Sequence, residues 1–169
     1  DDDIVYLTGI QQSHTGVEFE LSAQLNEMFR LDAGISMGNW VYTDDATGTY
    51  RDGTEDKSYS YALKDLKVGD MPQFGMNLGL TVVPVEGAKV QALYRLYALH
   101  HADWDPTSRE YSDGIPPDRN PVWRTPKYSI LDLNVSYDIP FEFSGVTSQV
   151  FLNIINALDE LYVQDASDN

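Results

Sequence analysis

The sequence predicts an all-β chain, an antiparallel up-and-down transmembrane β-barrel segment with about six long strands. Apolar and polar residues alternate with a period of two over six separate segments, which is typical of strands with two unlike faces. Each segment is roughly 9–14 residues long, whereas a strand needs about 9–11 residues to cross a bilayer and globular strands cluster near five or six. Short and long connections also alternate strictly along the chain, as periplasmic turns and outer loops do in such barrels.

The six predicted strands are read from this alternation in chain order. In the first, Val17, Phe19 and Leu21 alternate with Glu18 and Glu20. In the later strands the polar positions are mostly Gly, Asn, Gln and Ser with occasional charges, as expected for the wet interior of a barrel. The predicted strands cover residues 16–25, 29–42, 73–83, 89–100, 128–138 and 148–156.

The predicted connections divide the chain into two ends. Residues 26–28, 84–88 and 139–147 form short turns, which belong on the periplasmic side. Residues 43–72 and 101–127 are much longer and are the predicted outer loops. Most of the acidic residues lie in the long segments, so we expect the outer surface to be acidic.

Composition excludes several classes of function. The net charge is −16, with 27 acidic residues against 11 Lys and Arg, which argues against nucleic-acid binding. The chain has no cysteine, so it has neither disulfides nor thiolate metal sites. It contains no nucleophile motif, glycine-rich phosphate loop or metal-ligand spacing. We therefore expect no enzyme activity, no cofactor and no metal site.

Two stretches carry a resemblance to a known family. An apolar strand followed by Asn156-Ala157-Leu158-Asp159-Glu160-Leu161-Tyr162 resembles the Asn-Leu-Phe-Asp-x-x-Tyr pattern near the end of TonB-dependent receptors, with Ala-Leu where the family more often has Leu-Phe. Residues 128–137 are similar to the strand that precedes this pattern. Residues 69–73 resemble the Pro-led start of an earlier strand, and residues 94–97 with 102–106 are similar to receptors of the Bacteroidota.

This resemblance implies an active transporter of the bacterial outer membrane. Such a receptor imports a scarce nutrient, such as a ferric siderophore, haem, cobalamin or a glycan, with energy that the TonB complex relays through a plug. The expected partners are outer-membrane lipid, the nutrient, the TonB complex and a surface lipoprotein. These barrels close with about 22 strands. We therefore expect the chain to be a part of one, with a plug before Asp1 and a last strand after Asn169.

Two groups of residues are candidates for binding. The first lies at the start of the second outer loop and is weighed as a substrate contact against an ordinary solvated loop: His100, His101, Asp103, Trp104 and Asp105. The second group faces the predicted interior, where its members line a transport path, form structural ion pairs or contact the plug. It consists of Arg30, Asp32, Arg95 and Asp132.

Two alternatives remain open from the residues alone. One is a small complete outer-membrane barrel with an adhesive or structural role, which needs two further spanning strands. The other is a soluble β-barrel that binds a ligand, in which the apolar faces turn inward around a core. The second alternative predicts buried apolar faces, whereas a membrane barrel predicts exposed ones.

Overall fold

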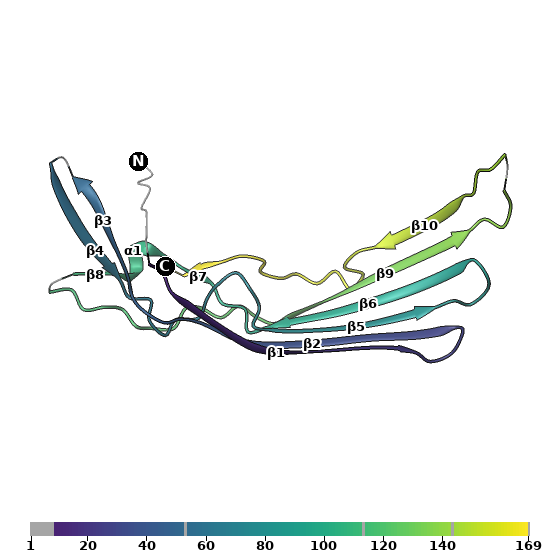
Figure 1. Cartoon of the computed structure of the whole chain (residues 1–169), viewed down its shortest axis with the longest axis horizontal. Coiled ribbons are helices and arrows are strands. Elements are labelled where there is room, and N and C mark those ends of the chain that lie inside the picture. Colours follow the sequence, from purple (N-terminus) through teal and green to yellow (C-terminus); the bar gives the residue numbers. More distant parts are fainter. Residues whose placement is uncertain (1–8, 53, 113, 143, 169) are drawn as a thin grey trace.

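The main unit of the protein is a six-stranded antiparallel sheet. The computed structural model describes residues 9–52, 54–112, 114–142 and 144–168. Strands that follow one another in the sheet also follow one another along the chain (Figure 1), so the predicted up-and-down barrel segment is confirmed. In sheet order, the strands are β1 (Gln12–Gln24), β2 (Phe29–Tyr42), β5 (Phe74–Val82), β6 (Ala88–Ala98), β9 (Tyr128–Asp138) and β10 (Gln149–Ile154).

The two ends of the sheet differ as the loop lengths predicted. The short turns after β1, β5 and β9 lie together at one end, and the long connections lie at the other (Figure 1). The first turn is shaped by Asn26, whose side-chain oxygen accepts hydrogen bonds from the backbone N–H groups of Met28 and Phe29, both at 2.9 Å. In the second turn Gly87 adopts a φ of 81°, a conformation that favours glycine.

The strand register places the two residue sets on opposite faces of the sheet. We call the side that carries Glu18 and Glu20 the polar face and the other side the apolar face. One row across the polar face, from β1 to β9, is formed by Glu20, Gly34, Asn77, Arg95 and Ile130.

The apolar face is exposed rather than packed against a second layer. Phe19 is 62% exposed, Leu78 45% and Leu152 59%. A soluble barrel would bury these side chains in its core, because each gives about 1.5–3 kcal/mol on burial. The arrangement therefore favours a membrane barrel over the soluble alternative. The sheet is also open, since no strand of the described residues pairs with the outer edge of β1 or β10.

The buried core lies instead beyond the ends of the strands, in what we call the loop layer: residues 43–72, 101–127 and 157–168. Its polar sequence gave no prediction of regular structure, yet it contains a hairpin, β3 (Ala46–Asp52) and β4 (Glu55–Tyr61), to which β8 (Glu110–Tyr111) adds a short third strand. A single helical turn, α1 (Pro106–Arg109), precedes β8. The core consists of Tyr42, Ala46, Tyr59, Tyr61, Leu63, Leu66 and Val122.

The C-terminal segment returns to this layer after β10. Its last described residues form β11 (Ser167–Asp168), which pairs in parallel with β7 (Asp103–Trp104) of the second outer loop. The Asp103 N–H donates to the Ala166 carbonyl at 2.8 Å. The loop layer is therefore built from three segments that are far apart in the sequence. Among the described residues, the structure contains no helix of the length and apolar character needed to cross a membrane.

Candidate functional site

The first and second outer loops are joined through one carboxylate. Asp45, just before β3, accepts two hydrogen bonds from the Arg119 guanidinium, each at 2.6 Å. It also accepts from the Tyr111 hydroxyl at 3.0 Å and from the Lys64 N–H at 2.9 Å. The hydrogen bonds from Arg119, above all, hold the pKa of Asp45 well below its usual range. This carboxylate therefore stays ionised and fixes one loop against the other.

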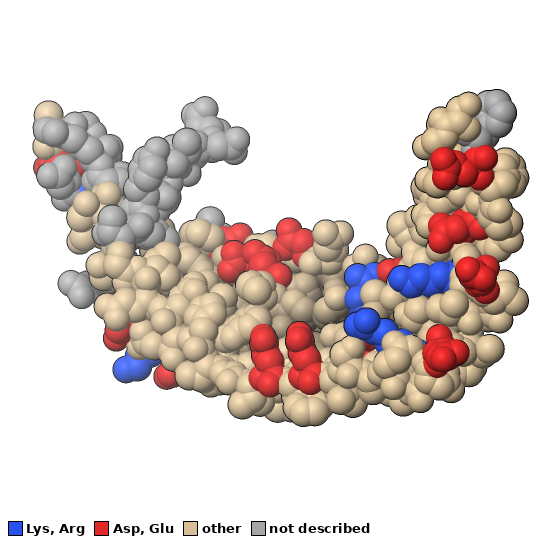
Figure 2. Space-filling model, turned by 45° about the vertical axis from the view of Figure 1, so that its right-hand side comes forward, with Lys and Arg blue, Asp and Glu red and all other residues tan. Residues whose placement is uncertain are grey.

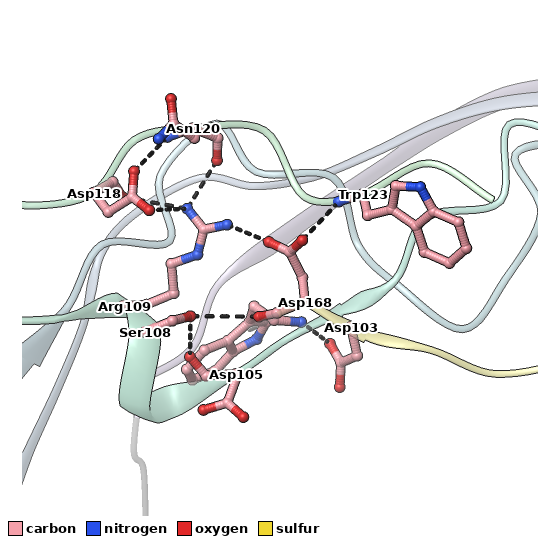
Figure 3. Close-up of polar contacts among 9 residues, drawn as sticks. Asp103, Asp105, Ser108, Arg109, Asp118, Asn120, Trp123 and Asp168 are labelled. Carbon is pink, nitrogen blue, oxygen red and sulfur yellow. Dashed lines mark hydrogen bonds and ion pairs between the residues drawn. The ribbon is translucent and has the colours of Figure 1, made fainter.

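A second junction ties the second outer loop to the C-terminal segment (Figure 3). Arg109, at the end of α1, is only 2% exposed, and its guanidinium contacts the Asp168 carboxylate at 2.6 Å. The same group donates to the Asn120 carbonyl at 2.8 Å. Asp168 also accepts from the Trp123 N–H at 3.1 Å. A buried guanidinium with several oxygen partners is a strong positional constraint, because leaving it unpaired is costly.

Trp104, one of the predicted substrate contacts, packs inside the loop layer. Its ring lies 5.5 Å from that of Tyr61 and 6.5 Å from that of Tyr42, and its indole N–H donates to the Tyr42 hydroxyl at 3.1 Å. It joins the loop core together with Val68. This position gives Trp104 a structural part in holding β7 against the outer end of β2.

The other residues of that predicted group lie around β7 in different settings. His100 is buried, and its backbone carbonyl accepts from the Thr125 N–H at 2.9 Å. His101 is half-buried, and burial, followed by the charge of Lys67, lowers the pKa of its imidazole. Asp103 and Asp105 are both half-buried, so their carboxylates remain partly open to solvent.

The predicted interior charges form two ion pairs on the polar face. Arg30 binds Asp32 on the same strand at 2.9 Å, and Ser22 donates to Asp32 at 2.6 Å. Further along the sheet, Arg95 of β6 forms an ion pair with Asp132 of β9. The structure thus brings each arginine to one aspartate and places all four residues on the polar face; that this face lines a transport path stays a prediction.

A hollow of about 450 Å³ lies on the same face between the first and fourth strands of the sheet. Gly34 and Gly75 are among its lining residues, and the side chains of Asn77 and Ser36 lie directly over them. Glu18 and Glu20 line it on β1, and Arg95 lines it on β6. Figure 2 shows most of the basic side chains of this view toward the short turns, where acidic side chains lie among them, and further acidic side chains along the middle of the surface.

The turn after β10 gives the Asn156–Tyr162 stretch a physical role. The Asn156 side chain donates to the Glu160 carbonyl and accepts from the Glu160 N–H, both at 3.1 Å. Its own N–H donates to the Asp132 carboxylate at 2.9 Å. Tyr162 then stacks on Tyr128, with ring centroids 4.3 Å apart and planes 11° from parallel. Together these contacts direct the chain from the sheet toward the loop layer.

Comparison with known proteins decides what this arrangement belongs to. A family model described as TonB dependent receptor-like, beta-barrel matches residues 3–157. The chain belongs to the TonB-dependent receptor β-barrel family. The family predicted from the sequence is therefore confirmed, and it is a family of outer-membrane transporters and receptors rather than of enzymes. Neither the curated proteins nor the solved structures compared with the chain gave a match.

In this receptor barrel, sequence reasoning missed the residues that build the loop layer. Asp45 and Arg119 are 74 positions apart, and Arg109 and Asp168 are 59 apart. Residues of this kind carry no periodic signal, because their contacts depend on how three irregular segments meet. Composition gave the one relevant signal: arginines are few in this acidic chain, so each arginine has many carboxylates with which it can form an ion pair.

Proposed function

We propose that this chain forms wall and outer loops of an outer-membrane transporter that imports a scarce nutrient, such as a ferric siderophore, haem, cobalamin or a glycan. The TonB complex would supply the energy through a plug inside the barrel. The observation that carries the proposal is the family match over residues 3–157, combined with a sheet that has one polar face and one exposed apolar face.

Each face has a part in this proposal. The apolar face meets lipid, where exposed side chains such as Phe19 and Leu78 lose no stability. The free edges of β1 and β10 must then be paired with further strands, because unpaired backbone is not tolerated in the hydrocarbon region. The polar face looks into the barrel, where the ion pair of Arg95 and Asp132 lines the path of the nutrient or contacts the plug.

The loop layer is the proposed place of first contact with the nutrient. Four members of the predicted substrate group are half-buried and so remain partly open to solvent: His101, Asp103, Trp104 and Asp105. Trp104 and His100 support this position from within, by packing and by pairing with Thr125. A surface lipoprotein is a further partner for this acidic surface, and co-purification tests it.

Nutrient uptake by whole cells tests the proposal. Cells lacking the gene for the full-length receptor should fail to accumulate one nutrient class, and depletion of TonB should abolish uptake in cells that have it. The double variant Asp103→Asn/Asp105→Asn should raise the concentration needed for half-maximal uptake. The double variant Asp138→Asn/Asp159→Asn, at the turn end and after β10, provides the matched control. Uptake that persists without TonB, or a receptor that purifies without detergent, contradicts the proposal.

A further inference from the structure

The hollow on the polar face has two unlike walls. It has a volume of about 450 Å³, and Glu18 and Glu20 line it on β1 while Arg95 and Tyr97 line it on β6. The strand register aligns Glu18 with Tyr97 and Glu20 with Arg95, in two neighbouring rows across the sheet. One wall is therefore acidic, and the other combines an aromatic ring with a guanidinium group.

Short polar side chains lie between the two walls. Gly34 and Gly75 occupy the middle of the two rows, and the side chains of Asn77 and Ser36 lie directly over them. A Cβ atom at either glycine would collide with these side chains. The space between the walls thus offers an amide and a hydroxyl group, both of which donate and accept hydrogen bonds.

A second hollow continues the first toward the outer end of the sheet. It has a volume of about 470 Å³ and shares Glu18 and Ser36 with the first. Trp40 lines it, and the indole ring lies against Gly38, where a Cβ atom would collide with the ring. His14 stacks on the indole, with ring centroids 5.6 Å apart and planes 24° from parallel. We call the two hollows together the wall groove, since each has an aromatic ring on its lining.

Neighbouring residues hold both aromatic rings of the wall groove in place. Tyr97 contacts Tyr128 of β9, with ring centroids 5.2 Å apart, and Tyr128 stacks in turn on Tyr162. The backbone carbonyl of Trp40 accepts a hydrogen bond from the buried side-chain amide of Gln73 at 3.0 Å. From strand geometry, the backbones at Trp40 and Tyr97 are about 13 Å apart along the strands and about 10 Å apart across them.

The charge of the wall groove disfavours an anionic ligand. Among the described residues, neither the Glu18 nor the Glu20 carboxylate is in an ion pair, whereas Arg95 is already paired with Asp132. Two unpaired carboxylates on one wall repel a ligand with negative charges, such as haem with its propionates. They accept hydrogen bonds readily from uncharged hydroxyl groups, and each carboxylate has two oxygens for this purpose.

We propose that the wall groove binds a neutral oligosaccharide, so that the nutrient of this receptor is a glycan. This inference rests on the proposed function and deepens it, because it selects one of the nutrient classes named there. A sugar ring has an apolar face of C–H groups, which packs on Tyr97 or Trp40, and an edge of hydroxyl groups, which the carboxylates and the Asn77 amide bind. The separation of the two aromatic rings fits several linked sugar units, and each hollow lies within the range of about 300–1,000 Å³ of small-molecule sites.

Calorimetric titration of the full-length receptor in detergent tests the proposal. The probes are neutral hexasaccharides of glucose, mannose, xylose or fructose, the four monosaccharides, haemin, a ferric catecholate and cyanocobalamin. We expect one hexasaccharide to bind about tenfold or more tightly than its monosaccharide, because the longer chain reaches both rings. Its affinity should change less than about twofold between about 0.05 M and 0.5 M NaCl, since a neutral ligand has no charge to screen.

Matched variants on the two faces of β6 locate the site. Tyr97→Ala should weaken binding of that hexasaccharide about tenfold, whereas Tyr97→Phe keeps the ring and should bind as the wild type does. Tyr94→Ala removes the same side chain from the apolar face of the same strand and should leave the affinity unchanged. Equal affinities of Tyr97→Ala and Tyr94→Ala overturn the proposal.

The acidic wall gives a second, independent pair of variants, which serves also if Tyr97→Ala does not fold. E18Q/E20Q should weaken hexasaccharide binding about three- to tenfold, because an amide accepts hydrogen bonds less strongly than a carboxylate. E27Q/E86Q makes the same change in two short turns and should bind as the wild type does. Unchanged binding by E18Q/E20Q overturns the proposal.

The nature of the ligand that binds separates this inference from the proposed function. If no hexasaccharide binds, or if the affinity falls steeply with salt as for a charged ligand, the wall groove does not bind a neutral glycan. TonB-dependent uptake of haemin, the ferric catecholate or cyanocobalamin would then leave the proposed function standing while the glycan is excluded. A heat-modifiable gel shift shows for each variant that the barrel is folded.

Discussion

Replacing Asp168 by Asn tests whether the junction between α1 and the C-terminal segment holds the loop layer together. Arg109 is 2% exposed and contacts Asp168 at 2.6 Å. Removing one partner of a buried pair costs about 3–5 kcal/mol. Asp168 is 21% exposed, and Arg109 keeps two partners, the Asn120 carbonyl and the Asp118 carboxylate at 3.6 Å, so we expect a smaller loss of about 2–3 kcal/mol. The equilibrium for local opening should then rise about 30- to 150-fold.

Hydrogen exchange of two backbone amides measures this opening. The Asp103 N–H is bonded to the Ala166 carbonyl, and the Trp123 N–H to the Asp168 carboxylate. Both should exchange faster in Asp168→Asn, whereas amides in the middle of β2 should keep their rates. Asp159→Asn is the matched control, because Asp159 has a positive φ that Asn accepts readily. If exchange at Asp103 and Trp123 is the same in both variants, the reasoning about the buried Arg109 is wrong.

Three further changes test other parts of the structure. Asp45→Asn should speed hydrogen exchange of the Lys64 amide about two- to fivefold, since a half-exposed ion pair contributes about 0.5–1 kcal/mol. Folding lowers the pKa of Asp45, so this stabilisation is present above the ordinary pKa of about 4 and is lost as the pH falls through the lowered value. The exchange rate of the wild type should therefore approach that of the variant only in strong acid. Asn156→Ala should lower the free energy of unfolding in urea by about 1–2 kcal/mol, and Asn156→Gly should lower it by less. Both variants lose the two hydrogen bonds with Glu160, but only alanine is also strained at a φ of 52°. Equal losses in the two variants would show that the backbone conformation is unimportant. Leu78→Arg should destabilise the barrel in vesicles by about 2–4 kcal/mol, whereas Glu20→Arg on the polar face should be tolerated, and the reverse order would mean that the faces are assigned wrongly.

The wall was predictable because its signal is local. Alternation of Val17, Glu18, Phe19 and Glu20 places unlike side chains on opposite faces of any extended strand, whatever surrounds it. Loop lengths then oriented the strands, since a short turn such as residues 26–28 can only join adjacent antiparallel strands. The exposed apolar face follows from the same pattern, and it separates a membrane barrel from a soluble one.

The candidate site was predictable only in part. The four interior charges could be assigned to the polar face from their positions, but the pairing of Arg95 with Asp132 depends on the register between β6 and β9. Trp104 was predicted at a loop, and the structure adds that it packs against Tyr42 and Tyr61. Which side of a loop an aromatic ring faces depends on neighbours that sequence spacing does not reveal.

The sequence by itself determined the class of fold, the direction of the strands and the family, because period-two alternation and loop length are properties of short segments. Only the tertiary structure decided how the outer loops are held. The hairpin β3–β4, the junction of Asp45 with Arg119 and that of Arg109 with Asp168 arise from segments far apart in the chain. Charged side chains in irregular loops have many possible partners, and the partner of each is selected by burial and distance, which exist only once the chain has folded.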